Sequence, residues 1–484
     1  MNYKMMGRFI GLIVMIEAVL LLPALGISLG YGETGAIRGL LWAMAAMAVF
    51  GGLLFFTCRK AKRIFGAKEG FACTALGWTV LSCLGCLPFV ISGDIPKYLD
   101  ALFEVVSGFT TTGASILSDV EALPKGLLYW RSFTNWLGGM GVLVFLLAVA
   151  PVSGGDKGFT MHLLRAESPG PDVGKLVPKM RRTAVILYGI YIAMTVLCFL
   201  FLLAGRMNPL EALCTAMSTA GTGGFGVRND SLASFSPYVQ NVCTVFLLLF
   251  GVNFSCYYLL LLKQVKSVVK DEELRLYVGI VVVSIVLIAL DVRHLYGTLE
   301  ETIRHASHQV ATIVTTAGFS TTDFDLWPAF SKAILLMLMI VGGCAGSTAG
   351  GLKCIRVLLL FKILRRNIRK LMNPRKVQVV RNNGKAVDEK ILDNVNAYLA
   401  AYIIFIVISY LLIALDGFSV GTNLSAVLAC FNNIGPGLEA VGPTCNFDIF
   451  SDFSKVILTI DMLAGRLEIF PVLVLASRST WKRK

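Results

Sequence analysis

The stretch Ser107-Gly-Phe-Thr-Thr-Thr-Gly-Ala-Ser115 lies between a short apolar segment and a polar loop, and it sets the pattern for the chain. Three related stretches follow at intervals of about 100 residues, as in a repeat architecture. They read Ser218-Thr-Ala-Gly-Thr-Gly-Gly-Phe-Gly226, Thr312-Ile-Val-Thr-Thr-Ala-Gly-Phe-Ser-Thr321 and Phe431-Asn-Asn-Ile-Gly-Pro-Gly437. The four stretches align on Gly113, Gly223, Gly318 and Gly435. The sequence therefore predicts four copies of one structural unit.

The composition is that of a polytopic membrane protein. Of the 484 residues, 56% are hydrophobic and 15% are charged, with a mean hydropathy of +0.73, whereas soluble proteins carry about 25% charged residues. The net charge of +14 comes from short basic clusters between apolar runs. This pattern is typical of cytoplasmic loops and argues against nucleic-acid binding. The 12 cysteines lie mostly within apolar runs, where cysteine packs as a small hydrophobic residue.

Apolar runs of about 20 residues predict spanning helices. Two such runs, Arg8–Leu29 and Ile37–Cys58, precede a basic cluster at 59–63, which the positive-inside rule places in the cytoplasm together with the N-terminus. Each later unit is expected to contain an outward helix, an apolar helix too short to cross, a glycine-rich stretch and a returning helix. The short helices are expected at Leu99–Phe109, Pro209–Thr219, Leu299–Thr315 and Gly421–Phe431.

The predicted fold is an all-α polytopic membrane protein with ten spanning helices and four re-entrant hairpins. Four non-identical helix–pore-helix–filter–helix repeats surround one pseudo-fourfold pore and follow two extra N-terminal transmembrane helices. All basic clusters, including the C-terminal one, fall on one side, so both chain ends are expected in the cytoplasm. The expected boundaries are 1–66 for the N-terminal helices and 67–182, 183–273, 274–392 and 393–484 for repeats 1 to 4. The returning helices are expected at Trp130–Pro151, Pro237–Leu262, from near Phe330 with a resumption at Leu352–Leu364, and Phe453–Ala476.

The glycine-rich stretches have the chemistry of a cation filter. Non-helical backbone at membrane depth is tolerated only where it is buried or lines a watery cavity. Backbone carbonyls can replace the hydration shell of potassium, and glycine lets the backbone turn toward the ion. The alternative is that Gly and Thr serve only helix packing. The residues predicted to bind K⁺ are Thr111, Thr112, Gly113, Gly221, Thr222, Gly223, Thr316, Ala317, Gly318, Asn433, Ile434 and Gly435.

The chain resembles the TrkH/KtrB family of the superfamily of K⁺ transporters. Thr110-Thr-Thr-Gly113, Asn432-Asn-Ile-Gly-Pro-Gly437 and Gly465-Arg-Leu-Glu-Ile-Phe-Pro471 carry the resemblance, which covers nearly the whole chain. It implies potassium uptake across the bacterial plasma membrane by a homodimer in which each protomer has its own pore. It also implies a cytosolic TrkA-like regulatory subunit, which alone would hold a nucleotide, so no bound cofactor besides K⁺ is expected on this chain. The basic inner loops would face that subunit, or they fix topology and contact anionic membrane lipid.

A glycine-rich interruption at 342–351 resembles the intramembrane gating loop of this family. The alternative is a close-packing face or a kink. Arg466 lies in the middle of an apolar helix, and an intramembrane charge is a functional hypothesis by default. In the family the matching arginine faces the pore near the gating loop, whereas the alternative is an ion pair with Asp461 or Glu468. The predicted gating residues are Gly342, Gly343, Gly346, Gly350, Gly351 and Arg466.

Other polar residues have weaker patterns. Glu104 is expected to brace the first filter, and Glu439 either attracts cations or is solvated surface. His305 and His308 are two possible metal ligands, too few for a site. We find no Ser/His/Asp set or paired carboxylates in an aqueous pocket, so an enzyme is not expected. The alternative function is a sodium- or proton-coupled secondary transporter of another solute, although such folds usually show inverted repeats.

Overall fold

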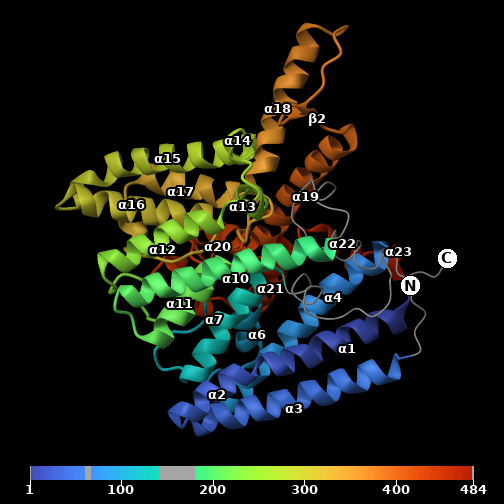
Figure 1. Cartoon of the computed structure of the whole chain (residues 1–484), viewed down its shortest axis with the longest axis vertical. Helices are drawn as coiled ribbons and strands as arrows, with labels where there is room; N and C mark the ends of the chain where they lie inside the picture. Colours follow the sequence, from blue (N-terminus) through green and yellow to red (C-terminus); the bar gives the residue numbers. More distant parts are fainter. Residues whose placement is uncertain (1, 60–66, 142–179, 482–484) are drawn as a thin grey trace.

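The computed structural model describes residues 2–59, 67–141 and 180–481. In this part of the chain the helices pack side by side in one bundle (Figure 1). The regular strands found in these ranges are β1 (Arg381–Asn382) and β2 (Lys385–Ala386), which form one antiparallel hairpin. The all-α prediction is therefore confirmed. The expected basic cluster from 60 onward and the end of the first returning helix lie outside the described residues.

Two N-terminal spans pack closely against each other. Helices α1 (Tyr3–Leu20) and α2 (Leu22–Tyr31) form the first span, and α3 (Thr34–Thr57) forms the second. Gly11 and Gly51 face each other, since a Cβ added to Gly11 would lie 2.7 Å from the Gly51 carbonyl oxygen. Small residues at such a crossing let two membrane helices approach closely. The two helices predicted ahead of the repeats are confirmed.

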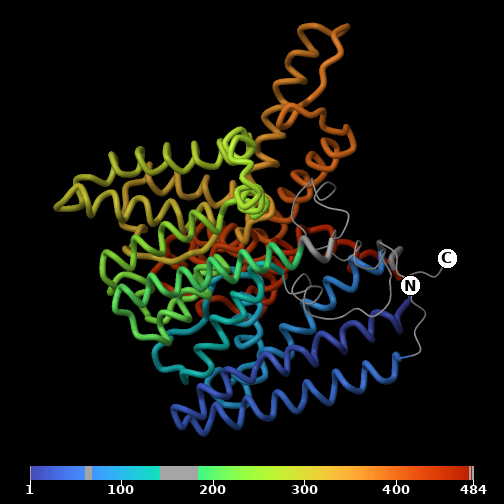
Figure 2. Tube along the Cα trace, in the orientation of Figure 1, coloured from blue at the N-terminus to red at the C-terminus, as the bar shows by residue number. Residues whose placement is uncertain are grey.

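Four further groups of helices follow in chain order and trace four similar units (Figure 2). Repeat 1 contains α4 (Ala67–Gly85), α5 (Leu87–Ser92), α6 (Tyr98–Phe109) and α7 (Lys125–Gly139). Repeat 2 contains α10 (Met180–Ala204), α11 (Pro209–Gly221), α12 (Pro237–Phe250) and α13 (Phe254–Leu261), and α14 (Val265–Val269) follows. Repeat 3 contains α15 (Glu272–Val292), α16 (Leu299–Val314), α17 (Ala329–Val341) and α18 (Cys354–Met372). Repeat 4 contains α19 (Glu389–Ile413), α20 (Val420–Phe431), α21 (Asp452–Arg466), α22 (Phe470–Ala476) and α23 (Arg478–Trp481). Short 3-10 turns lie at Arg293–Leu295, Phe324–Leu326, Ala414–Asp416, Glu439–Val441 and Phe447–Ile449.

The returning helices are more broken than the sequence predicts. Within the described residues, 6 helices are long and apolar enough to cross a membrane, or up to 7 with the bent pair α12–α13, whereas ten were expected. Helices α12 and α13 are bent by 87°, and α21 and α22 are separated at 467–469. The predictions of continuous helices at Pro237–Leu262 and Phe453–Ala476 are therefore wrong.

Close approach to the short helices explains where these breaks fall. A Cβ on Gly138 would overlap the Phe109 carbonyl oxygen at the end of α6, and a Cβ on Gly465 would overlap that of Phe431 at the end of α20. A Cβ on Gly251 would lie 2.7 Å from Thr315 Cγ2, just after α16. The returning helices thus pack their glycines against the ends of the short helices and leave the regular helical path near these contacts.

Helix α18 projects from the bundle together with the β1–β2 hairpin (Figure 1). It continues to Met372, so the basic residues Arg365 to Lys370 lie on a helix and not in the expected loop. The Asn383 amide donates to Glu272 Oε1 over 2.9 Å, and Arg366 pairs with Glu389 at 2.7 Å. These contacts tie the projection to the starts of α15 and α19.

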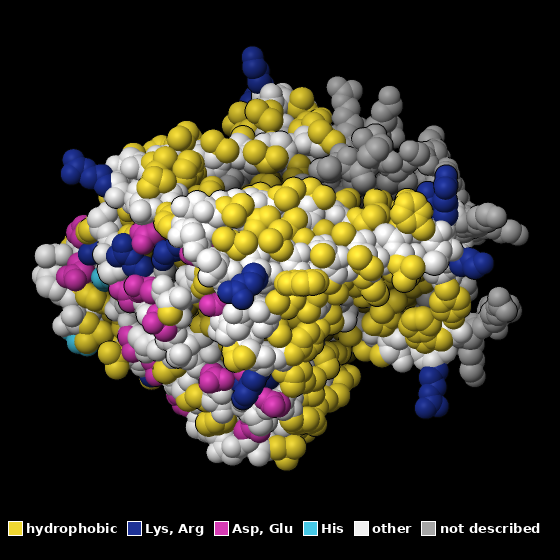
Figure 3. Space-filling model, turned by 90° about the horizontal axis from the view of Figure 1, so that it is seen from below, with side chains coloured by type: hydrophobic (Ala, Val, Ile, Leu, Met, Phe, Trp, Pro, Cys, Tyr) yellow, Lys and Arg dark blue, Asp and Glu magenta, His cyan; other side chains and the backbone are white. Residues whose placement is uncertain are grey.

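The outer surface of the bundle has the charge distribution of a multi-pass membrane protein. Apolar side chains cover the long helices, while charged side chains gather toward the two ends (Figure 3). Exposed apolar residues occur along α3, α10, α15 and α19, including Leu53, Ile192, Val282 and Leu411. Helices with apolar side chains turned outward are stable in lipid rather than in water.

Candidate functional site

The four short helices α6, α11, α16 and α20 end in the same backbone motif. After each helix an amide donates to the carbonyl five residues earlier: Thr112 to Ser107, Gly223 to Ser218, Ala317 to Thr312 and Ile434 to Ala429, over 2.7–2.9 Å. The residue before this amide is left-handed in every case, with positive φ at Thr111, Thr222, Thr316 and Asn433. The glycine after it is also left-handed, at Gly113, Gly224, Gly318 and Gly435. The predicted equivalence of the four stretches is thereby confirmed.

The register of the second stretch differs by one residue from the prediction. Gly224, with φ 68°, matches Gly113, whereas Gly223 matches Thr112. Thr222 is the left-handed residue that matches Thr111, so Gly221, at the end of α11, matches Thr110. The alignment of Gly221 and Gly223 with the other filters is therefore wrong. Three glycines lie within four positions here, so composition alone did not distinguish between them.

The four stretches form a closed ring. A Cβ on Gly113 would overlap the carbonyl oxygen of Gly223 in the next repeat, and a Cβ on Gly435 would lie 2.8 Å from that of Thr112. Likewise, a Cβ on Gly224 would overlap the Ala317 carbonyl oxygen, and a Cβ on Gly318 would overlap that of Ile434. Each glycine thus packs against the central carbonyl of the next stretch, in the order 1, 2, 3, 4 and back to 1. Each repeat contributes three residues to this ring: the left-handed residue, the central residue that follows it, and the glycine. We call these twelve residues the filter ring.

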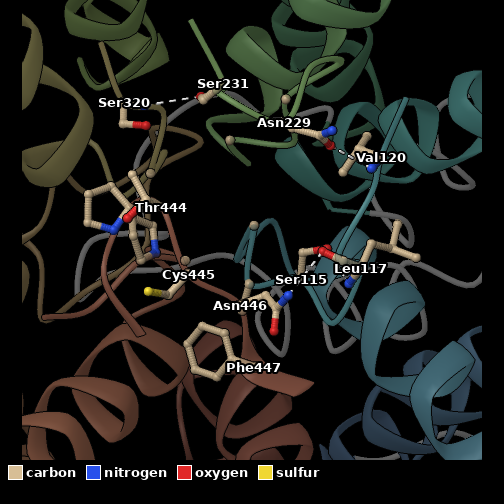
Figure 4. A pocket seen from close by; sticks show the side chains of 18 of the residues that line it. Ser115, Leu117, Val120, Asn229, Ser231, Ser320, Thr444, Cys445, Asn446 and Phe447 are labelled. Carbon is tan, nitrogen blue, oxygen red and sulfur yellow. Dashed lines mark hydrogen bonds between the residues drawn. The ribbon is translucent and has the colours of Figure 1, made fainter. Parts of the chain in front are cut away.

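A cavity of about 140 Å³, which we call the outer cavity, is lined by all four ring glycines. Figure 4 shows how loops from different repeats meet around it. The Val120 amide donates to Asn229 Oδ1 over 2.7 Å, and the Ser320 amide donates to Ser231 Oγ over 3.1 Å. The Phe447 amide donates to the Ser115 carbonyl over 2.9 Å. Neighbouring repeats are therefore tied together directly outside the ring.

A second cavity, of about 130 Å³, which we call the inner cavity, reaches the filter ring at Asn433. Its walls bring together Asn433 of the ring, the loop 342–351, and the two basic residues Lys353 and Arg466. The predicted filter and the predicted gating residues are thus adjacent, although they are far apart in the sequence.

The loop 342–351 is a compact turn pressed against the ring. Its two ends meet, since a Cβ on Gly351 would lie 2.8 Å from Gly342 Cα, and both glycines have positive φ. The Gly350 amide donates to Thr316 Oγ1 over 2.6 Å, and Thr222 Oγ1 donates to Thr348 Oγ1 over 3.3 Å. The loop therefore contacts the second and third filter stretches directly.

Arg466 joins this loop to the first repeat. Its guanidinium donates to the Thr348 carbonyl over 3.0 Å and to the carbonyls of Gly138 and Gly139 over 2.5 and 2.7 Å. Of the two carboxylates considered as alternative partners of Arg466, Glu468 pairs with Arg356 at 2.5 Å, and Asp461 accepts from Ser409 Oγ over 2.6 Å. The carbonyls that Arg466 reaches lie more than 100 residues away along the chain.

Two further charged residues hold the loop, and the sequence analysis did not include them. Lys353 is buried, and its Nζ donates to the Ala349 carbonyl. Glu273 Oε1 accepts from the amides of Ala345 and Ile355 over 2.6 and 3.2 Å. Lys353 lies two residues after the end of the glycine-rich run, between the apolar residues Leu352 and Cys354, and that position was the available signal.

The remaining candidates have structural partners. Glu104 accepts from Ser115 Oγ and the Ile116 amide, each at 3.0 Å, so the predicted bracing of the first filter is confirmed. His305 and His308 bond separately to Thr321 and Thr244. Among the described residues there is no group of three His, Cys, Asp or Glu that could hold a metal ion.

Glu439 is bonded at the start of α20. Its carboxylate accepts from the Thr422 amide and hydroxyl, each over 3.0 Å, and from the Ser419 hydroxyl, and that last bond is the main cause of a lowered pKa. We expect Glu439→Gln to destabilise the folded protein by about 1 kcal/mol, as loss of a helix N-cap does. Thermal unfolding in detergent measures this, with Asp393→Asn at an exposed position of α19 as the control. An unchanged melting temperature would contradict the capping role.

Relatives of known function match the whole chain. A family model described as "TrkH: Cation transport protein" matches residues 40–483. The Trk system potassium uptake protein TrkH of Escherichia coli is 36% identical over the full length of both chains, and TrkG of the same organism is 32% identical over 99% of each. The crystal structure of the potassium transporter TrkH from Vibrio parahaemolyticus superimposes with a TM-score of 0.88 at 32% identity, covering 100% of both chains. This fold has four repeats around one pore, and the chain belongs to the TrkH family of cation transport proteins.

Proposed function

We propose that this protein carries potassium into a bacterial cell through the filter ring, as the ion-conducting subunit of a Trk-type system in the inner membrane. The observation that carries the proposal is the closed ring, in which each glycine packs against the central carbonyl of the next repeat. Carbonyl oxygens grouped in this way supply the ligands that a dehydrated potassium ion needs. The ends of the four short helices direct their partial negative charge to the same place.

The ligands we propose follow the register of the structure. The K⁺-binding residues are Thr111, Thr112 and Gly113; Thr222, Gly223 and Gly224; Thr316, Ala317 and Gly318; and Asn433, Ile434 and Gly435. Gly221 is left out because it belongs to α11.

The loop 342–351 and Arg466 would form the gate on the inner side. The loop lies against Thr222 and Thr316 of the ring, so an ion leaving the filter meets it first. Gly342, Gly343, Gly346, Gly350 and Gly351 would allow it to change shape, because glycine adopts conformations closed to other residues. The positive charges of Arg466 and Lys353 in the inner cavity would oppose the passage of a cation.

The assembly we propose is a homodimer with one pore in each protomer and a cytosolic TrkA-like subunit that binds the nucleotide. The names of the relatives, which are components of Trk systems, support this assignment. The chain termini and the basic projecting helix α18 would lie in the cytoplasm, as the positive-inside rule predicts. Contact with anionic membrane lipid is expected along the same inner side.

The test is uptake of rubidium-86 into liposomes that contain the purified protein. A membrane potential, inside negative, would drive uptake with about 2.3 kcal/mol per unit charge per 100 mV. We expect uptake that depends on protein, that unlabelled potassium abolishes, and that sodium inhibits less. Absence of uptake, even with a TrkA-like subunit and nucleotide present, would contradict the proposal. It would favour a sodium- or proton-coupled transporter of another solute, which is our second candidate.

A further inference from the structure

Two oppositely charged residues are buried together beside the filter ring. Glu104 on α6 and Arg131 on α7 are 1% and 3% exposed, and Arg131 Nε lies 2.6 Å from Glu104 Oε1. A buried pair of this kind gives little net stability, but loss of one partner leaves the other charge uncompensated. Substitution of either residue is therefore expected to disturb the structure around the ring.

The pair connects the outer ends of two different filter stretches. The Glu104 carboxylate accepts from Ser115 Oγ, at the end of the first stretch, and from the amide of Ile116, the next residue. Arg131 Nη1 donates to the Gly226 carbonyl over 3.0 Å, two residues after the ring glycine of the second stretch. The guanidinium also lies over the Phe225 ring, 3.6 Å from its centroid. Stretches 1 and 2 are therefore linked through one ion pair.

The other repeats have no charge at this place. In the register of the ring, the residues that match Glu104 are Thr215, Gln309 and Ala426. Gln309 makes a longer bond in the opposite direction, donating from its Nε2 to the Thr322 carbonyl over 3.4 Å. The ion pair is thus a local feature of repeat 1 and not part of the pattern that the four repeats share.

Arg131 also lines the outer cavity through which an ion would reach the ring. A guanidinium is always protonated, so by itself it would repel a cation at this position. The carboxylate of Glu104, bonded to it, cancels that repulsion. The pair therefore does two things: it fixes the spacing of stretches 1 and 2, and it keeps the charge beside the outer cavity balanced.

We propose that the Glu104–Arg131 pair determines the specificity and rate of cation passage. The bonds from Glu104 and Arg131 hold the outer ends of stretches 1 and 2 at the separation that suits potassium, and the carboxylate neutralises Arg131 beside the ion path. This inference rests on the proposed function, because it requires that ions pass through the ring. Both residues are positioning residues, since neither is a ligand in the proposed set.

The test is a set of variants in the rubidium-uptake assay, each scored for rate and for the ratio of potassium to sodium inhibition. Glu104→Gln leaves Arg131 uncompensated, so we expect the rate and the ratio each to fall about tenfold. Glu104→Gln with Arg131→Gln removes both charges, and we expect the rate to recover several-fold while the ratio stays low. Arg131→Lys keeps the charge but loses the planar set of donors, so the ratio should fall with less effect on the rate.

The matched control is Glu300→Gln, which breaks the pair between the exposed Glu300 and Arg304 on α16 and should change neither quantity. Size-exclusion chromatography and thermal unfolding establish that each variant is folded. If Glu104→Gln does not fold, Arg131→Lys still tests the proposal. The proposal would be overturned if folded Glu104→Gln or Arg131→Lys kept the wild-type ratio of potassium to sodium inhibition. It would also be overturned if the double variant took up rubidium as slowly as Glu104→Gln. Failure of the wild-type protein to transport rubidium would instead overturn the proposed function.

Discussion

Replacing Gly224 by alanine is expected to reduce rubidium uptake at least about a hundredfold. Gly224 has φ 68°, a left-handed conformation that costs a residue with a side chain about 1 kcal/mol or more. The larger effect is steric, because the added Cβ would overlap the carbonyl oxygen of Ala317, which is a proposed potassium ligand. The carbonyl would have to move out of the ring, and a displaced ligand no longer replaces the hydration shell.

Two controls make this prediction specific. Gly279→Ala, on α15, adds a methyl group where no atom lies within 4 Å, so uptake should be unchanged. Gly223→Ala adds a Cβ that meets the Asn135 side chain and requires no left-handed backbone, so we expect a smaller loss than at Gly224. A greater loss at Gly223 than at Gly224 would contradict the register of the second stretch. Normal uptake in folded Gly224→Ala would contradict conduction through the ring.

Replacing Arg466 by alanine is expected to increase uptake about tenfold. A tenfold change corresponds to about 1.4 kcal/mol of barrier. Arg466 places a positive charge on the inner cavity and holds the loop through the Thr348 carbonyl. Its removal lowers the repulsion of an ion leaving the filter and frees the loop from its bond to the fourth repeat. The initial rate of rubidium uptake per folded protein measures the effect.

The conservative variant separates the two causes of the expected increase. Arg466→Lys retains the charge but cannot bond all three carbonyls in the same geometry, so we expect an increase smaller than that of the alanine variant. Arg369→Ala, on the projecting part of α18, removes a positive charge away from the pore and serves as the control. Uptake below the wild-type rate in folded Arg466→Ala would mean that Arg466 keeps the pathway open and does not obstruct it.

Much of the candidate site could be predicted from residue order because its signals are local. A short apolar helix followed by Gly and Thr residues marks each filter stretch, whatever surrounds it. The interruption at 342–351 is visible for the same reason, since a run of glycines does not sustain a helix. The bracing role of Glu104 followed from its place three residues before Ser107. The partners of these residues are non-local, and residue order did not identify them.

The sequence by itself determined the membrane class, the four repeats, the order of their elements and the alignment of the glycine-rich stretches in three of the repeats. Only the tertiary structure decided the register at Gly224, because three nearby glycines all permit a left-handed backbone and the end of α11 selects one. Only the tertiary structure revealed the breaks after Phe250 and Arg466, because apolar residues resume after both and it is packing against the short helices that interrupts the helical path. The partners of Arg466, at Gly138 and Thr348, also depend on the tertiary structure, because a closed ring brings together residues from different repeats.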